Sequence, residues 1–194
     1  MTKILIENYS PQWAETFQQL KTVYLQNLGN LVSDIQHVGS TSVVGLAAKP
    51  IIDIDIIIDD PKKLDAVIEK LAVLGYEHRG DLGIKDREAF KRSSEQTPFD
   101  GSFRIWEKHH LYVCLLGSIS LNNHLAFRDF LRNHADKAKE YGALKKNLAQ
   151  KYPFDIDLYV DGKTSFIINI LQLAGFVQTD LDDIVKSNTI PLKK

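Results

Sequence analysis

The sequence predicts an α+β protein, with a mixed sheet in its first part and helices in its last part. Short runs of β-forming residues separated by glycines fill much of the chain up to residue 117, whereas helical periodicity dominates residues 118–176. With 194 residues, 44% of them hydrophobic and 25% charged, the chain has the size and composition of one globular domain. We therefore expect a single domain with a sheet-containing core over 1–117, a helical part over 118–176 and an extended C-terminal arm over 177–194.

The core is expected to begin with a short strand and a long helix. Residues 3–7 predict the strand, and the helix runs from Pro11 to about Leu28, where Gly29 ends it. Apolar side chains recur through this helix at helical spacing, namely Trp13, Phe17, Leu20, Tyr24 and Leu28.

The strongest strand of the chain is the run IIDIDIII at residues 51–58, which follows another predicted strand at 31–37. Asp60 and Pro61 then predict the capped first turn of a helix to about Leu74. Further strands are expected at 76–79, 87–92, 102–106 and 110–116, followed by helices at 119–133, 135–151 and 163–175.

Charge and cysteine content exclude several classes of protein. The net charge of −1 gives no global attraction to nucleic acid or to anionic membranes, so any site for a polyanion must be local. The single cysteine, Cys114, cannot form an intramolecular disulfide and lies in an apolar run that predicts a buried thiol. No run approaches the roughly 18 apolar residues of a membrane span, and the N-terminus does not resemble a signal peptide. We expect a cytoplasmic protein with no membrane partner.

Asp53 and Asp55 are the first candidate site residues. They lie two apart on the predicted strand, so both side chains point to one face while the isoleucines point to the other. Aspartate is rare in strand interiors, and two neighbouring carboxylates repel each other. A divalent cation such as Mg²⁺ would offset that cost, whereas the alternative is a polar face exposed to water.

The turn His37-Val-Gly-Ser-Thr-Ser is the second candidate. Gly39 allows close approach of the backbone to an anion, and the hydroxyls of Ser40 and Thr41 are potential phosphate ligands. The pattern is neither a Walker A loop nor a dinucleotide-binding fingerprint, and Lys49 follows shortly after it. A plain turn is the alternative, but a nucleoside triphosphate would use both a phosphate-binding turn and a neighbouring metal site.

Three further groups of residues are candidates. Arg79 and Arg87 belong to a glycine-containing loop and are suited to binding phosphate or an acidic acceptor, or are solvated arginines of a hairpin. His110 is a candidate base or metal ligand, or a histidine hydrogen-bonded within the sheet. Residues 124–151 carry seven basic side chains against three acidic ones, among them Arg128 and Lys145, which bind anions or form a solvated helix face.

The run HVGSTSVVGLAAKPIIDIDIII resembles the signature of the GrpB-like family, a branch of the nucleotidyltransferase superfamily that includes DNA polymerase beta. The segments GYEHRGDLGIKDREAF, HHLYVCLLGS and HLAFRDFLRNH resemble further blocks of that family, so the resemblance covers about residues 5 to 175. It implies a nucleotidyltransferase-like mixed sheet flanked by helices, with the glycine-serine turn and the D-x-D strand on adjacent elements.

The resemblance also implies roles and a reaction. Gly39 and Ser40 would bind the triphosphate, and Asp53 and Asp55 would hold Mg²⁺ or Mn²⁺. A hydroxyl of an unknown small molecule or nucleic-acid end would attack the α-phosphate of ATP or another nucleoside triphosphate, and pyrophosphate would leave.

The chain departs from the superfamily pattern on one later strand. That strand normally supplies a third carboxylate, but the matching segment here, beginning at His110, contains none, and Tyr112 stands where relatives often have histidine. A nucleotidyltransferase is the main hypothesis. A nucleotide- or cofactor-binding module without chemistry, which regulates or stabilises a partner, is the alternative, and a hydrolase or phosphotransferase with the same metal site is the third.

Overall fold

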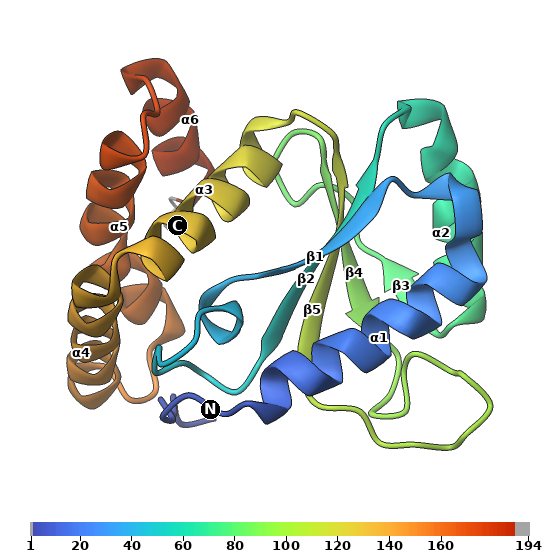
Figure 1. Cartoon of the computed structure of the whole chain (residues 1–194), viewed down its shortest axis with the longest axis horizontal. Coiled ribbons are helices and arrows are strands. Elements are labelled where there is room, and N and C mark those ends of the chain that lie inside the picture. Colours follow the sequence, from blue (N-terminus) through green and yellow to red (C-terminus); the bar gives the residue numbers. More distant parts are fainter. Residues whose placement is uncertain (1, 189–194) are drawn as a thin grey trace, which may run out of the picture.

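The computed structural model describes residues 2–188, and its centre is a five-stranded mixed sheet (Figure 1). The strand order is β1-β2-β5-β4-β3. The strands are β1 (Asp34–Val38), β2 (Ile52–Ile58), β3 (Tyr76–His78), β4 (Arg87–Arg92) and β5 (His109–Leu115). β2 and β5 are parallel, and the other neighbouring pairs are antiparallel, so the predicted α+β class with a mixed sheet is confirmed.

The helices lie on both faces of this sheet. They are α1 (Gln12–Leu28), α2 (Leu64–Val73), α3 (Ile119–Asn133), α4 (Ala135–Lys151), α5 (Ile156–Leu173) and α6 (Gln178–Asn188). Short 3-10 turns cover Gly29–Leu31, Ser40–Ser42 and Pro61–Lys63. Figure 1 shows α3 crossing the sheet and α4, α5 and α6 gathered at one end of the molecule.

The main hydrophobic core lies between one face of the sheet and the helices α1 and α2. The even-numbered isoleucines of β2, from Ile52 to Ile58, all lie in it and are at most 3% exposed. Burial of these side chains is the main favourable contribution to folding. Because side chains alternate along a strand, the odd-numbered residues of β2 face the opposite side, where α3 covers Ile57 and Cys114 through Leu121.

A buried polar chain crosses the main core. The hydroxyl of Tyr24 lies 2.6 Å from that of Tyr76, which lies 2.5 Å from Nε2 of His109, and Nδ1 of His109 donates to the carbonyl of Glu107 at 2.9 Å. Burial lowers the pKa of His109 to about 3, so the ring is neutral and accepts the Tyr76 proton through Nε2. The three side chains therefore satisfy one another without water.

Four predictions about elements need correction. Residues 3–7 form no strand but only a single bridge between Glu7 and Ala48. Residues 102–106 form a loop, in which the indole of Trp106 donates to the carbonyl of Pro98. The helix expected at 163–175 begins instead at Ile156, where Asp155 caps it.

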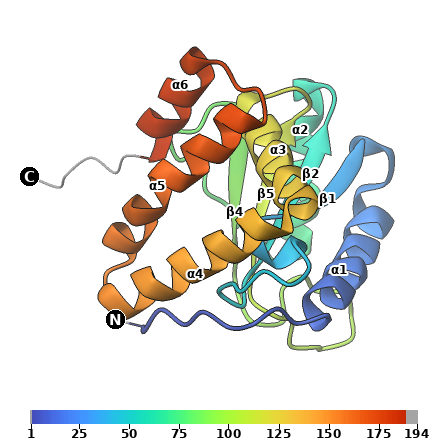
Figure 2. The same cartoon turned by 60° about the vertical axis from the view of Figure 1, so that its left-hand side comes forward.

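The fourth correction concerns the expected extended arm. Its described part is the helix α6, which packs Leu181 and Ile184 against Leu171 of α5, and residues 189–194 lie outside the described chain. Figure 2 shows α6 next to α5 and the α4–α5 turn beside the N-terminal segment. Across residues 2–188, every helix is too short or too polar to cross a bilayer.

Candidate active site

Two carboxylates of β2 share the sheet face that lies opposite the main core. Asp53 and Asp55 alternate with the core isoleucines, as their spacing predicts. Asp55 is fully buried, whereas the side chain of Asp53 is 31% exposed. A ligand can therefore reach Asp53 from solvent and would meet Asp55 deeper in the protein.

The turn after β1 brings Gly39 against Asp53. Gly39 has a φ of +67°, and a Cβ atom at this position would lie 2.1 Å from Oδ2 of Asp53, closer than real Cβ atoms approach any atom. Only glycine combines this conformation with this contact. Oγ of Ser42 donates to the carbonyl of Gly39 at 2.6 Å and closes the turn. The half-buried hydroxyl of Ser40 makes no hydrogen bond with any described residue, so it is available to a ligand.

Thr41, in contrast, uses its hydroxyl within the protein. The hydroxyl donates to the carbonyl of Ile51 at 3.3 Å and is hydrogen-bonded to Nε2 of His37 at 3.0 Å. Burial lowers the pKa of His37 to about 4, so this ring is neutral at physiological pH. Thr41 therefore fixes the turn to β2.

A histidine donates to each carboxylate. Nδ1 of His110 lies 2.9 Å from Oδ1 of Asp53, because β5 places His110 directly beside Asp53. Nδ1 of His124, on α3, lies 2.7 Å from Oδ2 of Asp55. Burial lowers the pKa of His124, but the Asp55 carboxylate outweighs burial and the net pKa is raised. His124 was not among the residues predicted from the sequence.

The two carboxylates fit a hard divalent cation. Oδ1 of Asp55 is buried and has no hydrogen-bond partner in the described chain, and Oδ2 of Asp53 makes no hydrogen bond there either. Within residues 2–188, His, Cys, Asp and Glu side chains nowhere form a group of three or more suited to a metal. Mg²⁺ is often held by one or two carboxylates and completes its shell with water and substrate phosphates, so these two ligands suffice only for an ion shared with a ligand.

Three lysines from distant segments gather near Asp53. Lys49 precedes β2, whereas Lys145 and Lys163 come from α4 and α5. The amines of Lys49 and Lys163 lie 5.4 and 4.8 Å from the ring centre of Tyr159, and that of Lys145 lies 4.6 Å from the ring centre of Tyr141. We call Lys49, Lys145 and Lys163 the lysine cluster.

The three amines of the lysine cluster lie close enough to repel one another when they are protonated. Lys145 is 2% exposed, and its amine has no hydrogen-bond acceptor within the described residues. Burial, together with the charges of Lys163 and Lys49, lowers the pKa of Lys145 to about 7, although Asp53 opposes this. Burial and Lys49 lower the pKa of Lys163 to about 8. A buried polyanion would relieve this repulsion and restore the usual pKa values.

Lys163 was missed from the sequence. The helix that carries it was predicted to begin at residue 163, so Tyr159 and Lys163 were not recognised as neighbours one turn apart. The signal was the N-cap sequence at Asp155, which moves the start of the helix seven residues earlier and places both side chains on one face.

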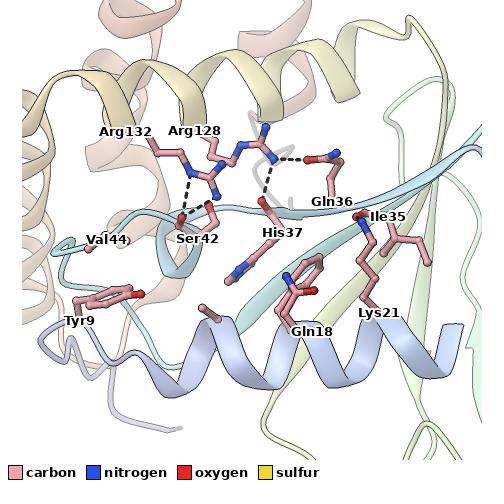
Figure 3. Close-up of a pocket in the computed structure, with 12 residues that line it drawn as sticks. Tyr9, Gln18, Lys21, Ile35, Gln36, His37, Ser42, Val44, Arg128 and Arg132 are labelled. Carbon is pink, nitrogen blue, oxygen red and sulfur yellow. Dashed lines mark hydrogen bonds between the residues drawn. The ribbon is translucent and has the colours of Figure 1, made fainter. Parts of the chain in front are cut away.

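Arg128, a predicted phosphate ligand, has almost all its donors engaged elsewhere. Its Nε and Nη2 donate to the carboxylate of Asp129. Its Nη1 donates to Oε1 of Gln36 and to the carbonyl of His37, as Figure 3 shows. The structure therefore does not bring Arg128 into the lysine cluster; it joins α3 to β1.

Arg132 and Lys21 make similar contacts along β1, which is an edge strand. Arg132 donates through Nε and Nη2 to the carbonyl of Ser42, and Nζ of Lys21 donates to the carbonyl of Ile35 at 2.8 Å. These side chains and Arg128 line a pocket of about 600 Å³ between α1 and α3, shown in Figure 3.

The two arginines of the glycine-containing loop differ from each other. Arg79 is exposed and lies 3.7 Å from the carboxylate of Glu77. Arg87 is half-buried, with its guanidinium carbon 4.5 Å from the ring centre of Tyr112. Tyr112, on β5, is paired with Asp55, on β2. Arg87 therefore borders the two carboxylates, whereas Arg79 does not.

The sequence profile of the GrpB protein family matches residues 3–173, which is most of the chain. This chain belongs to the GrpB family. The predicted family assignment is thereby confirmed.

A solved structure and a related protein sequence support the assignment. The crystal structure of the conserved protein GrpB from Enterococcus faecalis is 34% identical, with a TM-score of 0.74, and covers 88% of this chain and 96% of that one. The UPF0157 protein YqkA of Bacillus subtilis is 34% identical over 85% of this chain, but the chain spans only 45% of the length of YqkA. A structure of the Cid1 poly(U) polymerase with MgGTP bound matches 73% of this chain and 45% of that one, at 13% identity and a TM-score of 0.43.

The third carboxylate that the resemblance implies is absent from β5. In the register of β2 and β5, His110 lies beside Asp53 and Tyr112 beside Asp55, and β5 contains no aspartate or glutamate. The place next to the carboxylate pair is thus taken by an imidazole and a phenol.

Proposed function

We propose that this protein is a metal-dependent nucleotidyltransferase, which transfers a nucleoside monophosphate from a nucleoside triphosphate to a hydroxyl acceptor and releases pyrophosphate. One observation carries the proposal: the Gly39 turn, the carboxylate pair and the lysine cluster, which come from separate segments of the chain, converge at Asp53. A triphosphate with its metal ion needs a turn that admits phosphate, carboxylates for the ion and cations for the remaining charge.

The donor nucleotide would lie between the turn and the lysine cluster. Ser40 and the backbone at Gly39 would contact the triphosphate, and the amines of Lys49, Lys145 and Lys163 would neutralise the β- and γ-phosphates. The buried and unpartnered amine of Lys145 is the strongest support for this placement, because a protonated amine without an acceptor is costly in the apo protein.

In the reaction, the acceptor oxygen forms a bond to the α-phosphorus while the bond from that phosphorus to the bridging oxygen breaks. Asp53 and Asp55 would hold the ion, and such an ion, when bound, supplies charge stabilisation to the transferring phosphoryl group. The lysine cluster would stabilise the charge that develops on pyrophosphate. His110 is placed to take the acceptor proton, because its Nδ1 is held by Asp53 and its Nε2 makes no hydrogen bond in the described chain.

Two observations favour a second function, a nucleotide-binding module without turnover. β5 lacks a carboxylate, and His124 already donates to Asp55. Such a protein would bind a nucleotide through the same turn and lysines, but would not activate an acceptor.

Calorimetry with each nucleoside triphosphate and Mg²⁺ or Mn²⁺ separates these functions, together with assays for pyrophosphate and phosphate release in the presence of a panel of hydroxyl compounds. We expect metal-dependent binding, its loss in the Asp53→Asn, Asp55→Asn double variant, and pyrophosphate release with some acceptor. Binding without release under either metal would favour the binding module, and release of phosphate would favour a hydrolase. No binding of any triphosphate would contradict both nucleotide proposals.

A further inference from the structure

We propose that Arg87 forms a second anion subsite, which binds the carboxylate or phosphate of a small hydroxylated acceptor on the side of Asp53 and Asp55 opposite the donor nucleotide. This inference rests on the proposed function, since it assigns the acceptor to that same site. The first support is the arrangement of the strands. Gly39 follows β1, on one side of β2, whereas Arg87 lies on β4, two strands away on the other side.

Arg87 lies on the same face of the sheet as the two carboxylates. Asp55 is paired with Tyr112, and Tyr112 is paired with Ala89, two residues after Arg87. Because alternate residues of a strand share a face, Arg87, Tyr112 and Asp55 all face the side that α3 partly covers. The guanidinium carbon of Arg87 lies 4.5 Å from the centre of the Tyr112 ring, and Tyr112 is the residue paired with Asp55.

The guanidinium of Arg87 stacks on Tyr112 but has no hydrogen-bond or ion-pair partner among residues 2–188. Its Nε is buried, and no residue of the described chain accepts a hydrogen bond from any of its nitrogens or pairs with it at ion-pair distance. Arg128 and Arg132, by comparison, donate to oxygens of Asp129, Gln36 and Ser42. Stacking on an aromatic ring orients a guanidinium but leaves its edge donors open, and those donors match an oxyanion with two oxygens.

The surroundings favour a small anion over a nucleic-acid strand. Residues 76–92, which span β3, the loop and β4, contain four acidic and five basic residues, so the strands and loop around Arg87 carry a net charge of only +1. A nucleic-acid backbone requires a track of several cations, whereas one open guanidinium binds one oxyanion. An acceptor held there would present its hydroxyl toward His110 and Asp53, which lie on the neighbouring strands.

The test follows the side-chain Nε–H resonances of arginines by NMR in the full chain, with inorganic phosphate and acetate as probes. The nucleotide site is first loaded with Mg²⁺ and an α,β-methylene analogue of ATP. We expect saturable shifts of the Arg87 resonance with phosphate, acetate or both, and the stronger probe tells whether the acceptor anion is a phosphate or a carboxylate. In Arg87→Gln the affinity for that probe, followed in both proteins by the backbone amide resonances of β4 and β5, should fall about tenfold or more, as expected for charge-assisted hydrogen bonds.

Arg79→Gln is the matched control, because Arg79 lies on the same loop but is exposed and near Glu77, and it should leave the affinity unchanged. The proposal is overturned if neither probe shifts Arg87, or if the analogue alone shifts Arg87 and abolishes probe binding, since Arg87 would then belong to the donor site. If the analogue does not bind, the proposed function fails. The oxyanion subsite would then still be supported if the probe binds at Arg87 in a Lys145→Gln, Lys163→Gln variant. Should Arg87→Gln fail to fold, the shift of the wild-type resonance decides alone.

Discussion

Replacing Gly39 by alanine tests whether the turn and the carboxylate pair act as one site. The new Cβ atom would lie 2.1 Å from Oδ2 and 2.9 Å from Cγ of Asp53, so the carboxylate must rotate away. Rotation breaks its hydrogen bond with His110, which costs about 1 kcal/mol net. With a φ of +67° and a ψ of −171°, the backbone of Gly39 lies in a region that is essentially restricted to glycine, which adds roughly 1–3 kcal/mol of strain for a residue with a side chain.

Gly45→Ala is the matched control, because Gly45 has a φ of +79° but nothing within 4 Å of a Cβ atom. We expect Gly45→Ala to lower the free energy of unfolding by about 1 kcal/mol through backbone strain alone, and Gly39→Ala by roughly 2–4 kcal/mol. Urea denaturation measures both. Calorimetry should separate the two variants as well, because Gly39→Ala should weaken metal-dependent nucleotide binding by about tenfold or more, a loss of at least about 1.4 kcal/mol, whereas Gly45→Ala should leave it unchanged.

Two results would refute this reasoning. If Gly39→Ala destabilises the protein no more than Gly45→Ala, then moving the Asp53 carboxylate away from position 39 costs no free energy. If Gly39→Ala also binds the nucleotide normally, the position of the Asp53 carboxylate is not set by the turn, and the proposed convergence of the two elements has no functional meaning.

Three other predictions concern buried ionisable groups. Burial lowers the pKa of Lys145 to about 7, so the unfolded chain binds more protons between about pH 7 and 10.5. Stability of the apo protein should therefore rise with pH in that window, and Lys145→Met should raise the free energy of unfolding at pH 7, remove part of the slope in urea denaturation and weaken nucleotide binding. The pKa of His124 is raised by Asp55, a contribution that is complete below about pH 6.5 and lost as the pH rises through the raised pKa. The stability difference between wild type and Asp55→Asn should accordingly shrink from pH 5.5 to 9, and a constant difference would contradict the His124–Asp55 pairing. Burial lowers the pKa of His109 to about 3, so stability should fall below about pH 6.5 by up to roughly 1.4 kcal/mol per pH unit. His109→Gln should make the acid limb of the stability curve shallower, and an unchanged limb would show that other groups cause it.

Much of the carboxylate site could be read from local pattern. The alternation of isoleucine and aspartate at 52–58 shows which side chains share a face, and the glycine-serine turn at 39–42 comes shortly before this strand in the sequence. These features depend on spacing along one strand, which the sequence displays directly.

Features that depend on contacts between distant segments could not be read in this way. The segment SFRIW at 102–106 alternates like a strand, but Arg104 stacks on Trp106 at 4.1 Å and the indole is bonded within its own loop. Similarly, the charge on Arg128 is visible in the sequence, but the acceptors on Gln36 and His37 that occupy it are not. Lys163 and the missing partner of Arg87 are likewise properties of the folded chain.

The contacts of Lys21, Arg128 and Arg132 along β1 have a consequence for self-association. The free edge of a sheet offers backbone groups to the strand of another molecule and is a common origin of aggregation. Here two edge-strand carbonyls, those of Ile35 and His37, are taken by cationic side chains, and a third side chain holds the carbonyl of Ser42 just beyond the strand. A second copy that added a strand at this edge would have to break these bonds and bring like charges together. The opposite edge is β3, which is only three residues long. Both edge strands of the sheet, β1 and β3, are therefore poor templates for pairing with a strand of another molecule. The pocket between α1 and α3 can for this reason lie beside β1 without making the protein prone to form fibres.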